Sequence, residues 1–247
     1  MFQHIGEMVL MLCRTLCAWP QVWRQRQKVL DQLFDIGNAS LFMVCILSLF
    51  IGGVLSLQSG PVLADRGLAG VLGAIVGTSM CKELAPVMMA VLIAGRIGSA
   101  MAAEIGSMQV YQEIDALRTM NINPLSYLVL PRLVAIAVAL PLLTIFSILI
   151  GWFGGAVVAA TNPRVGVPFQ SFFRVLSENV DAGDVANGLF KSLCFAIVIG
   201  VVSCQQGLAT IGGPRGVGRS VTKAVVNSIV LILILDYFLT RLLLYFQ

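Results

Sequence analysis

The sequence predicts an all-α, polytopic membrane protein: an N-terminal interfacial amphipathic helix, five transmembrane helices, and a cytoplasmic helix between the second and third spans. The 247 residues are 58% hydrophobic and only 11% charged, whereas soluble domains are about 25% charged. Because so few polar side chains cannot cover the surface of a chain of this size, lipid must solvate much of it. Long uncharged runs also alternate with short polar segments, as repeated membrane crossings require.

The composition excludes several functional classes. The formal net charge of +4 comes from scattered basic residues, with no basic stripe carrying interleaved aromatic residues, which argues against nucleic acid binding. The six cysteines form no C-x-x-C pair and His4 is the only histidine. We therefore expect buried structural cysteines, no metal site and no catalytic residues, which leaves an intramembrane enzyme without support.

The N-terminal region, residues 1–37, has apolar residues at helical spacing with Arg14, Arg24, Arg26 and Lys28 beside them. This pattern predicts a helix lying in the membrane interface and broken near Pro20. A soluble amphipathic segment packed on a partner is the alternative. The apolar run at 8–13 is too short for a cleaved signal peptide.

The remaining chain, 38–247, is predicted to form one transmembrane domain, because a span needs about 20 apolar residues. The five spans are expected at roughly 38–58, 70–103, 133–163, 187–208 and 222–244. The second is longer than one perpendicular crossing, which indicates a long or tilted helix that Pro86 can kink.

The polar stretches 161–185 and 209–222 are predicted as loops. The second contains GPRGVGRS at 213–220, which resembles a phosphate-binding P-loop with arginine in place of its lysine. Membrane spans flank this stretch instead of the strand and helix that a P-loop needs, so its glycines are expected to make a tight turn.

The distribution of basic residues predicts the orientation in the membrane. Nine Lys and Arg residues lie in segments 1–37, 104–132 and 205–223, against five on the opposite side. By the positive-inside rule, the N-terminus and both of these loops are cytoplasmic.

Lys82 and Glu83 are ionisable residues inside an apolar run. Lys82 lies fourteen residues from Arg96, roughly 20 Å along a helix, which places it well within the hydrocarbon if Arg96 marks the interface. Ionisable groups at that depth usually face a protein interior or a wet cavity. We interpret Lys82 and Glu83 as a contact for a polar headgroup or as a gate. The alternative is a structural ion pair, for instance with Asp236.

A ladder of small residues follows the charged pair. Ala94, Gly98 and Ala102 recur every four residues, and Gly95 and Ser99 form a second stripe beside them. Small-xxx-small stripes let membrane helices approach closely. The pattern leaves open whether the partner helix belongs to the same chain or to a second copy.

The segment at about 109–123 is acidic, helix-compatible and placed between two spans. It is suited to docking a soluble partner through Glu113, Asp115, Leu117 and Arg118, and the alternative is a plain solvated loop.

Several segments together resemble the MlaE-type permease subunits of lipid-transporting ABC systems. They occur in the expected order over most of the chain: KELAPV at 82–87, GRIGSAMAAEIGSM at 95–108, EIDALRTMNINPLSYLVLPR at 113–132, LPLLT at 140–144, GVGRSVTKAVV at 216–226 and LDYFLT at 235–240.

The resemblance implies a transporter permease, not an enzyme, that pairs with a second copy of itself. It also implies that residues 109–123, called the coupling segment below, dock an ABC ATPase. ATP and Mg²⁺ would be used by that ATPase, with no cofactor bound by this chain. A periplasmic ring protein of the MCE type is the further partner that the resemblance implies. The family moves phospholipids between the bacterial inner membrane and the periplasmic carrier, which implies a role in outer membrane lipid asymmetry.

The resemblance also assigns substrate contact to Lys82 and Glu83. The family commonly has arginine at the first position, and lysine keeps the charge without the bidentate fork. The alternative function is an ATP-independent channel or ion-coupled transporter that uses Lys82, Glu83 and Asp236. Transport direction, lipid preference and a bacterial or plastid source are left open, although a bacterial membrane is favoured because no transit-like extension is seen.

Overall fold

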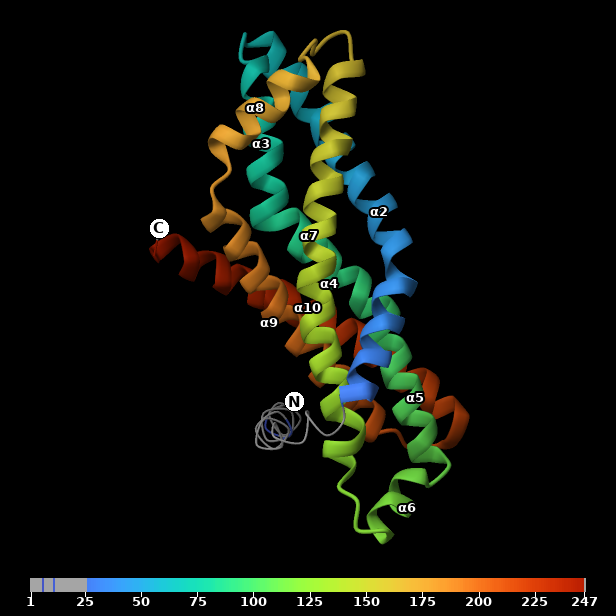
Figure 1. The fold of residues 1–247 in the computed structure, drawn as a ribbon. Helices are drawn as coiled ribbons and strands as arrows, with labels where there is room; N and C mark the ends of the chain where they lie inside the picture. The colour runs from blue at the N-terminus through green and yellow to red at the C-terminus, as the bar shows by residue number, and fades with distance from the viewer. Residues whose placement is uncertain (1–5, 7–10, 12–25, 247) are drawn as a thin grey trace. The chain divides into compact units, whose positions relative to one another are not determined.

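The computed structural model describes residues 6, 11 and 26–246, and this part of the chain is helical with no strand. Five helical stretches in it are long and apolar enough to cross a membrane (Figure 1): Arg26–Asp65, Ala69–Val110, Leu125–Thr161, Ala182–Leu208 and Gly213–Tyr245. The prediction of an all-α, multi-pass membrane protein is therefore confirmed, and each observed stretch contains most or all of one predicted span.

The first stretch is a single helix, α2 (Arg26–Asp65). The second stretch changes its helical type several times along its length. It consists of a 3₁₀ turn (Ala69–Val71), α3 (Leu72–Ser79), a π-helical turn (Met80–Leu84), α4 (Ala85–Ile93), a second π-helical turn (Ala94–Gly98) and α5 (Ser99–Val110).

The rest of the chain begins with the short helix α6 (Glu113–Thr119), which Gln112 precedes in the left-handed conformation with φ of 61°. A third π-helical turn (Leu125–Val129) leads into α7 (Leu130–Thr161). Three more helices complete the fold: α8 (Phe169–Asn179), α9 (Ala182–Leu208) and α10 (Gly213–Phe246).

Two predicted loops differ from the structure. Residues 169–179 form helix α8 within the predicted loop 161–185, because their apolar side chains recur at i, i+3, i+4 and i+7 and cover α3. The predicted loop 209–222 is wrong over most of its length, since α10 begins at Gly213. Gly212 and Gly213, with φ of 96° and 71°, make the turn. Pro214 is tolerated in the first turn of α10 because backbone N–H groups there have no acceptor within the helix, so the N–H that proline lacks is not missed.

The N-terminal prediction falls largely outside the described residues. Of the segment 1–37, residues 26–37 are part of α2, which runs without a break past residue 37. The same helix continues past residue 58, the predicted end of the first span, runs through Pro61 and ends at Asp65. The observed turn at Arg66 and Gly67 is closed by main-chain hydrogen bonds to Leu63 and Ala64.

The contacts divide the chain into two compact units. Unit 1 consists of Met1–Ala39, Ala90–Leu140 and Leu193–Tyr245. Unit 2 consists of Ser40–Met89, Pro141–Ser192 and Phe246–Gln247.

In unit 2, α2 and α7 pack through glycines. A Cβ on Gly52 would overlap the Gly151 carbonyl, and one on Gly154 would overlap the Leu49 carbonyl. The Ser48 and Ser147 hydroxyls form a hydrogen bond of 2.7 Å across this contact. Such close backbone approach replaces the hydrophobic effect, which lipid cannot supply between helices.

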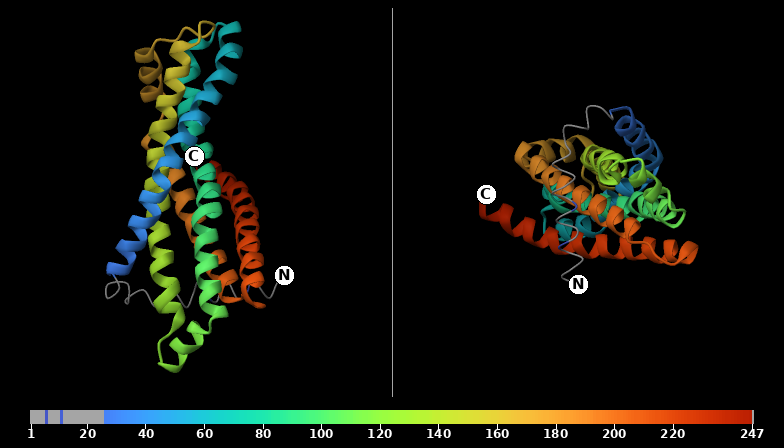
Figure 2. Two further views of the ribbon diagram at one scale, coloured as in Figure 1. Left: turned by 90° about the vertical axis from the view of Figure 1, so that its right-hand side faces the viewer. Right: turned by 90° about the horizontal axis from the view of Figure 1, so that it is seen from below.

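In unit 1, α5 and the π-helical turn Ala94–Gly98 before it pack against α9, and α5 also meets the start of α10. A Cβ on Gly98 would lie 2.8 Å from Ser203 Oγ, and one on Gly207 would lie 2.8 Å from Ile105 Cβ. Figure 2 shows α10, in red, beginning beside the end of α5, where Gly106 faces Val217.

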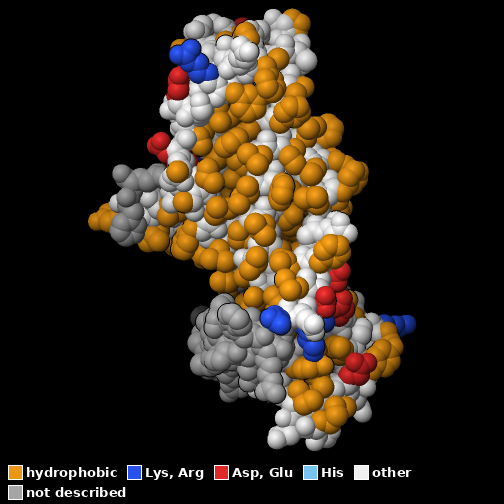
Figure 3. Space-filling model, viewed as in Figure 1, with side chains coloured by type: hydrophobic (Ala, Val, Ile, Leu, Met, Phe, Trp, Pro, Cys, Tyr) orange, Lys and Arg blue, Asp and Glu red, His pale blue; other side chains and the backbone are white. Residues whose placement is uncertain are grey.

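The surface of the helices is apolar along most of its area. On the face shown in Figure 3, hydrophobic side chains cover the helices, and the Lys, Arg, Asp and Glu side chains gather near helix ends. Large apolar side chains are exposed on α2, α7 and α10, including Phe50, Phe146 and Leu233 at 63%, 49% and 55%. Lipid is the solvent that makes such surfaces stable.

The glycine contact in unit 2 gives a testable prediction. Gly52→Ala should lower the stability by about 1–3 kcal/mol, because the new methyl group overlaps a main-chain carbonyl that cannot rotate away. Gly37→Ala on the same helix is the matched control, since its Cβ meets nothing within 4 Å. Thermal unfolding in detergent, followed by tryptophan fluorescence, should show a lower Tm for the first variant only. Equal melting temperatures would contradict the packing described.

Candidate functional site

The candidate site is built on the π-helical turn Met80–Leu84 of unit 2. In this turn the Ala85 N–H donates to the Met80 carbonyl, one residue further back than in an α-helix. Pro86 follows and has no N–H, so the Lys82 carbonyl loses the donor that an α-helix would give it. A main-chain carbonyl without a donor is costly in a membrane helix.

The side chain of Lys191 on α9 supplies the missing donor. Its Nζ donates to the Lys82 carbonyl at 3.1 Å and to Glu83 Oε1 at 2.7 Å. The Lys191 side chain is only 3% exposed, whereas that of Glu83 is 39% exposed. The buried ammonium is therefore held by one carboxylate and by the carbonyl that Pro86 leaves without a donor.

Lys82 forms a second ion pair with the same helix. Its Nζ lies 3.0 Å from Asp184 Oδ1, with the two side chains 41% and 10% exposed. In the Lys191–Glu83 pair the cation is buried and the carboxylate is accessible. In the Lys82–Asp184 pair the carboxylate is buried and the cation is accessible.

The register of α9 explains how these residues meet. Asp184, Gly188 and Lys191 are spaced i, i+4 and i+7, so they lie on one face of the helix, and all three are buried. A Cβ on Gly188 would overlap the Cys81 carbonyl and lie 3.3 Å from Pro86 Cγ. The missing side chain at this position lets α9 approach the π-helical turn closely enough for both ion pairs to form.

Only half of this cluster was predicted from the sequence. Lys82 and Glu83 were predicted, with Asp236 as the structural carboxylate, whereas the structure pairs Lys82 with Asp184. Asp236 lies half-buried on α10 in unit 1, where its carbonyl accepts a hydrogen bond from Thr240 Oγ1 at 2.8 Å. Asp184 fell in the predicted loop 161–185, whereas Lys191 lies in the predicted span 187–208, so a lysine inside an apolar span was the available signal.

The small-residue ladder lies in unit 1 and its two stripes differ. Ala94, Gly98 and Ala102 are buried, and Gly98 faces Ile199 and Ser203 on α9 of the same chain. In the second stripe, Gly95 is exposed with nothing within 4 Å of its Cβ position, and Ser99 is half-buried.

The coupling segment forms α6, whose residues have different exposures. Ile114 is fully buried and Leu117 is half-buried, and both pack in the unit 1 core with Ile105 and Leu128. Glu113 is exposed on the same helix. The remaining two predicted residues, Asp115 and Arg118, are exposed and form an ion pair of 3.0 Å with each other.

Two exposed residues at the ends of this segment were missed by the sequence analysis. Tyr111 and Met120 are 72% and 61% exposed and flank α6 on either side. Large apolar residues exposed in a polar segment are the signal that could have found them.

The described residues hold no group of three or more His, Cys, Asp or Glu side chains that could bind a metal ion. The charged cluster offers an ammonium and a carboxylate, each more than one-third exposed, and each paired with a buried opposite charge.

Comparison with known proteins supplies the family. The family model described as Permease MlaE matches residues 29–242. A probable ABC transporter permease protein of Synechocystis is 39% identical over 88% of this chain and 82% of its own. The intermembrane phospholipid transport system permease protein MlaE of Haemophilus influenzae is 34% identical over 98% of this chain and 92% of its own. The chloroplastic protein trigalactosyldiacylglycerol 1 of Arabidopsis thaliana is 34% identical over 95% of this chain and 65% of its own.

The Lys191 contacts predict a non-additive pair of mutations. Glu83→Gln should destabilise the protein because it leaves a buried ammonium without its carboxylate. The loss should be below the roughly 3–5 kcal/mol of a fully buried pair, since Glu83 is 39% exposed. Glu83→Gln combined with Lys191→Met should lose less stability than the sum of the two single variants. Chemical or thermal unfolding in detergent measures this cycle, and strictly additive losses would show that the pair is not coupled.

Proposed function

We propose that this chain, which belongs to the MlaE permease family, is the membrane subunit of an ATP-driven transporter of phospholipids. Its family makes it a transporter permease, not an enzyme. The finer assignment is that it moves phospholipids between the bacterial inner membrane and a periplasmic MCE-type carrier. The name of the Haemophilus relative, a phospholipid transport permease, supports this choice of substrate.

The observation that carries the proposal is the exposure of Lys82. A phospholipid headgroup brings a phosphate, and a cation within a membrane helix is a costly feature that marks a substrate path. Lys191 is buried and its contacts are internal, whereas 41% of the Lys82 side chain is accessible. Lys82 can thus exchange its Asp184 partner for a lipid phosphate, while Glu83 stays with Lys191.

The coupling segment is proposed to receive the ATPase. Ile114 and Leu117 fix α6 to the unit 1 core, so a force applied to its exposed residues is passed to α5 and α7 instead of bending a free loop. Tyr111 and Met120 offer the apolar contacts, and Glu113 offers a charge. ATP and Mg²⁺ are bound by that partner and not by this chain.

A second copy of this chain and a periplasmic ring protein complete the proposed assembly. α10 is the span with the least burial in the structure, 11% of its apolar window. Its exposed side chains, such as Val230, Leu233 and Tyr237, suit either lipid or a second copy. The nine basic residues predicted on the side of the N-terminus support a cytoplasmic location of that terminus and of α6.

Native mass spectrometry of the complex that this chain assembles tests the proposal. The expected species contains two copies of this chain, an ABC ATPase, an MCE-type ring protein and bound phospholipid. The chain can also be placed in proteoliposomes without any ATPase. Lipid transport driven there by an ion gradient would refute ATP coupling and support the ion-coupled alternative.

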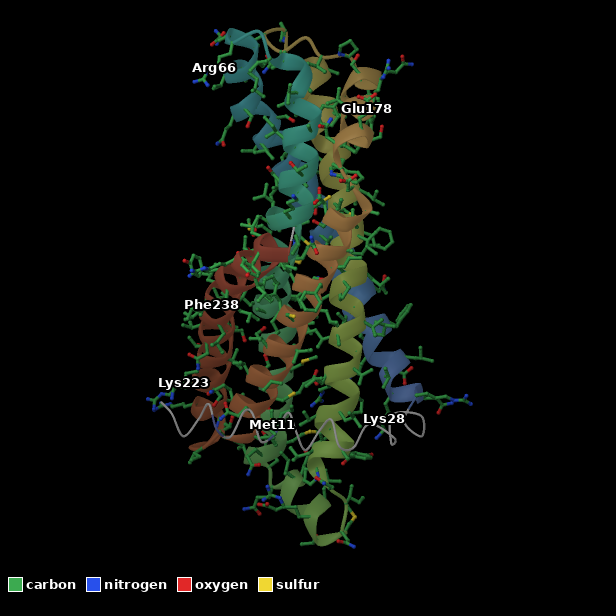
Figure 4. The ribbon with its side chains drawn as sticks, turned by 90° about the vertical axis from the view of Figure 1, so that its left-hand side faces the viewer. Met11, Lys28, Arg66, Glu178, Lys223 and Phe238 are labelled. Carbon is green, nitrogen blue, oxygen red and sulfur yellow. The ribbon has the colours of Figure 1, made fainter. Side chains whose placement is uncertain are left out.

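The docking role of α6 predicts an effect of charge reversal. Glu113→Lys should abolish or strongly reduce co-purification of the ATPase, because an exposed residue of the docking helix changes sign while the fold is kept. Glu178→Lys is the matched control, an exposed carboxylate on α8 (Figure 4). Leu117→Asp is less informative, since Leu117 also packs in the core. Unchanged co-purification in Glu113→Lys would remove α6 from the docking surface.

A further inference from the structure

Arg132 on α7 and Glu104 on α5 form an ion pair that has no part in the proposed docking or lipid contact. The Arg132 Nη2 donates to Glu104 Oε2 at 2.8 Å. Arg132 is 8% exposed, whereas the side chain of Glu104 is 57% exposed. Among the described residues, Glu104 is the only ion-pair partner of Arg132. The pair therefore joins a buried guanidinium to an accessible carboxylate.

The ion pair lies on either side of the coupling segment in the chain. Glu104 precedes α6 and Arg132 follows it, 28 residues later. Figure 1 shows α6 between the end of α5 and the segment that leads into α7. Residues 104–132 are thus closed at their base by the ion pair and carry the proposed docking surface at their far end.

The same ion pair fixes the register of α5 against α7. The other contacts in this part of unit 1 are apolar and involve Ile105, Ile114, Leu128, Val129 and Leu133. Apolar attraction is non-directional, whereas an ion pair requires two particular groups to meet, which is how buried charges can set the register of helices. A shift of α5 along α7 by one helical turn, about 5.4 Å, would leave the buried guanidinium without its carboxylate.

We propose that Glu104 and Arg132 are positioning residues for transport: their ion pair keeps α5 and α7 in register, so that a force on α6 reaches both helices together. This inference rests on the proposed function, in which α6 receives the ATPase. Neither residue lies on α6, and both belong to unit 1, whereas Lys82 belongs to unit 2. Because α5 ends the helical stretch 69–110 that contains Lys82, loss of register should separate ATP hydrolysis from lipid transfer.

Arg132→Met tests the proposal in the complete complex with its ATPase, reconstituted in proteoliposomes with a labelled phospholipid. Methionine removes the buried charge and also the Arg132 Nη1, which has no hydrogen-bond partner among the described residues. The Glu104 carboxylate that remains is exposed, so the fold should be kept.

We expect the ATPase to co-purify with Arg132→Met as it does with the original chain. The number of lipids transferred per ATP hydrolysed should fall about fivefold or more, the lower end of the usual coupling between sites. Arg132→Lys should retain most of this ratio, because an ammonium can replace the single hydrogen bond from Nη2 to Glu104.

Two controls separate positioning from stability. In detergent, Arg132→Met should melt at the temperature of the original chain, whereas Glu104→Gln should melt lower because it leaves a buried guanidinium without a carboxylate. Arg174→Met breaks the exposed Arg174–Glu178 pair on α8 and should keep both the melting temperature and the lipid-to-ATP ratio.

An unchanged lipid-to-ATP ratio in Arg132→Met would overturn the proposal, whatever its melting temperature. The exchanged pair, Glu104→Arg with Arg132→Glu, should transfer more lipid per ATP than Glu104→Arg alone, and an equal or lower ratio would overturn it as well. A complex of the original chain that transfers no lipid with ATP would refute the proposed function, and this proposal with it.

Discussion

The hydrogen bond from Lys191 to the Lys82 carbonyl is the interaction on which the charged cluster depends. Pro86 leaves this carbonyl without a donor, and lipid offers none. Lys191 satisfies it and neutralises Glu83 with the same ammonium. Because Glu83 is engaged in this way, Lys82 pairs with Asp184 and remains partly exposed. Lys191 thus links the carbonyl opposite Pro86 to the charged cluster, in which the Lys82 side chain is 41% exposed.

The π-helical turn and the coupling helix belong to consecutive parts of the chain. Residues 69–110 form one continuous helical stretch that contains the Lys82 turn and the small-residue ladder and leads into α6. A second π-helical turn, Ala94–Gly98, interrupts the α-helical hydrogen bonding between them. π-Helical turns are rare and are frequently found at functional sites.

The sequence predicted the spans well and the cluster only in part, for physical reasons. Uncharged runs identify membrane helices because charge is costly in lipid, so five spans were predictable. The ion pairs were not, because sequence periodicity does not say which helices meet, and Asp184 fell in the predicted loop 161–185. α8 was missed because its polar face resembles a loop when only charge is considered. The start of α10 was misplaced because glycines at 213, 216 and 218 favour a turn, whereas Gly216 is needed for close approach to the Ile211 carbonyl.

In the proposed function, the accessible ammonium of Lys82 contacts the phosphate of the transported lipid. ATP-dependent transfer of a labelled phospholipid by the complete complex in proteoliposomes tests it most directly. We expect Lys82→Gln to reduce transfer by about tenfold or more and Lys82→Arg to retain it. Lys223 is an exposed lysine on α10 (Figure 4), and Lys223→Gln should transfer at the original rate. Transfer by Lys82→Gln at the original rate would contradict it.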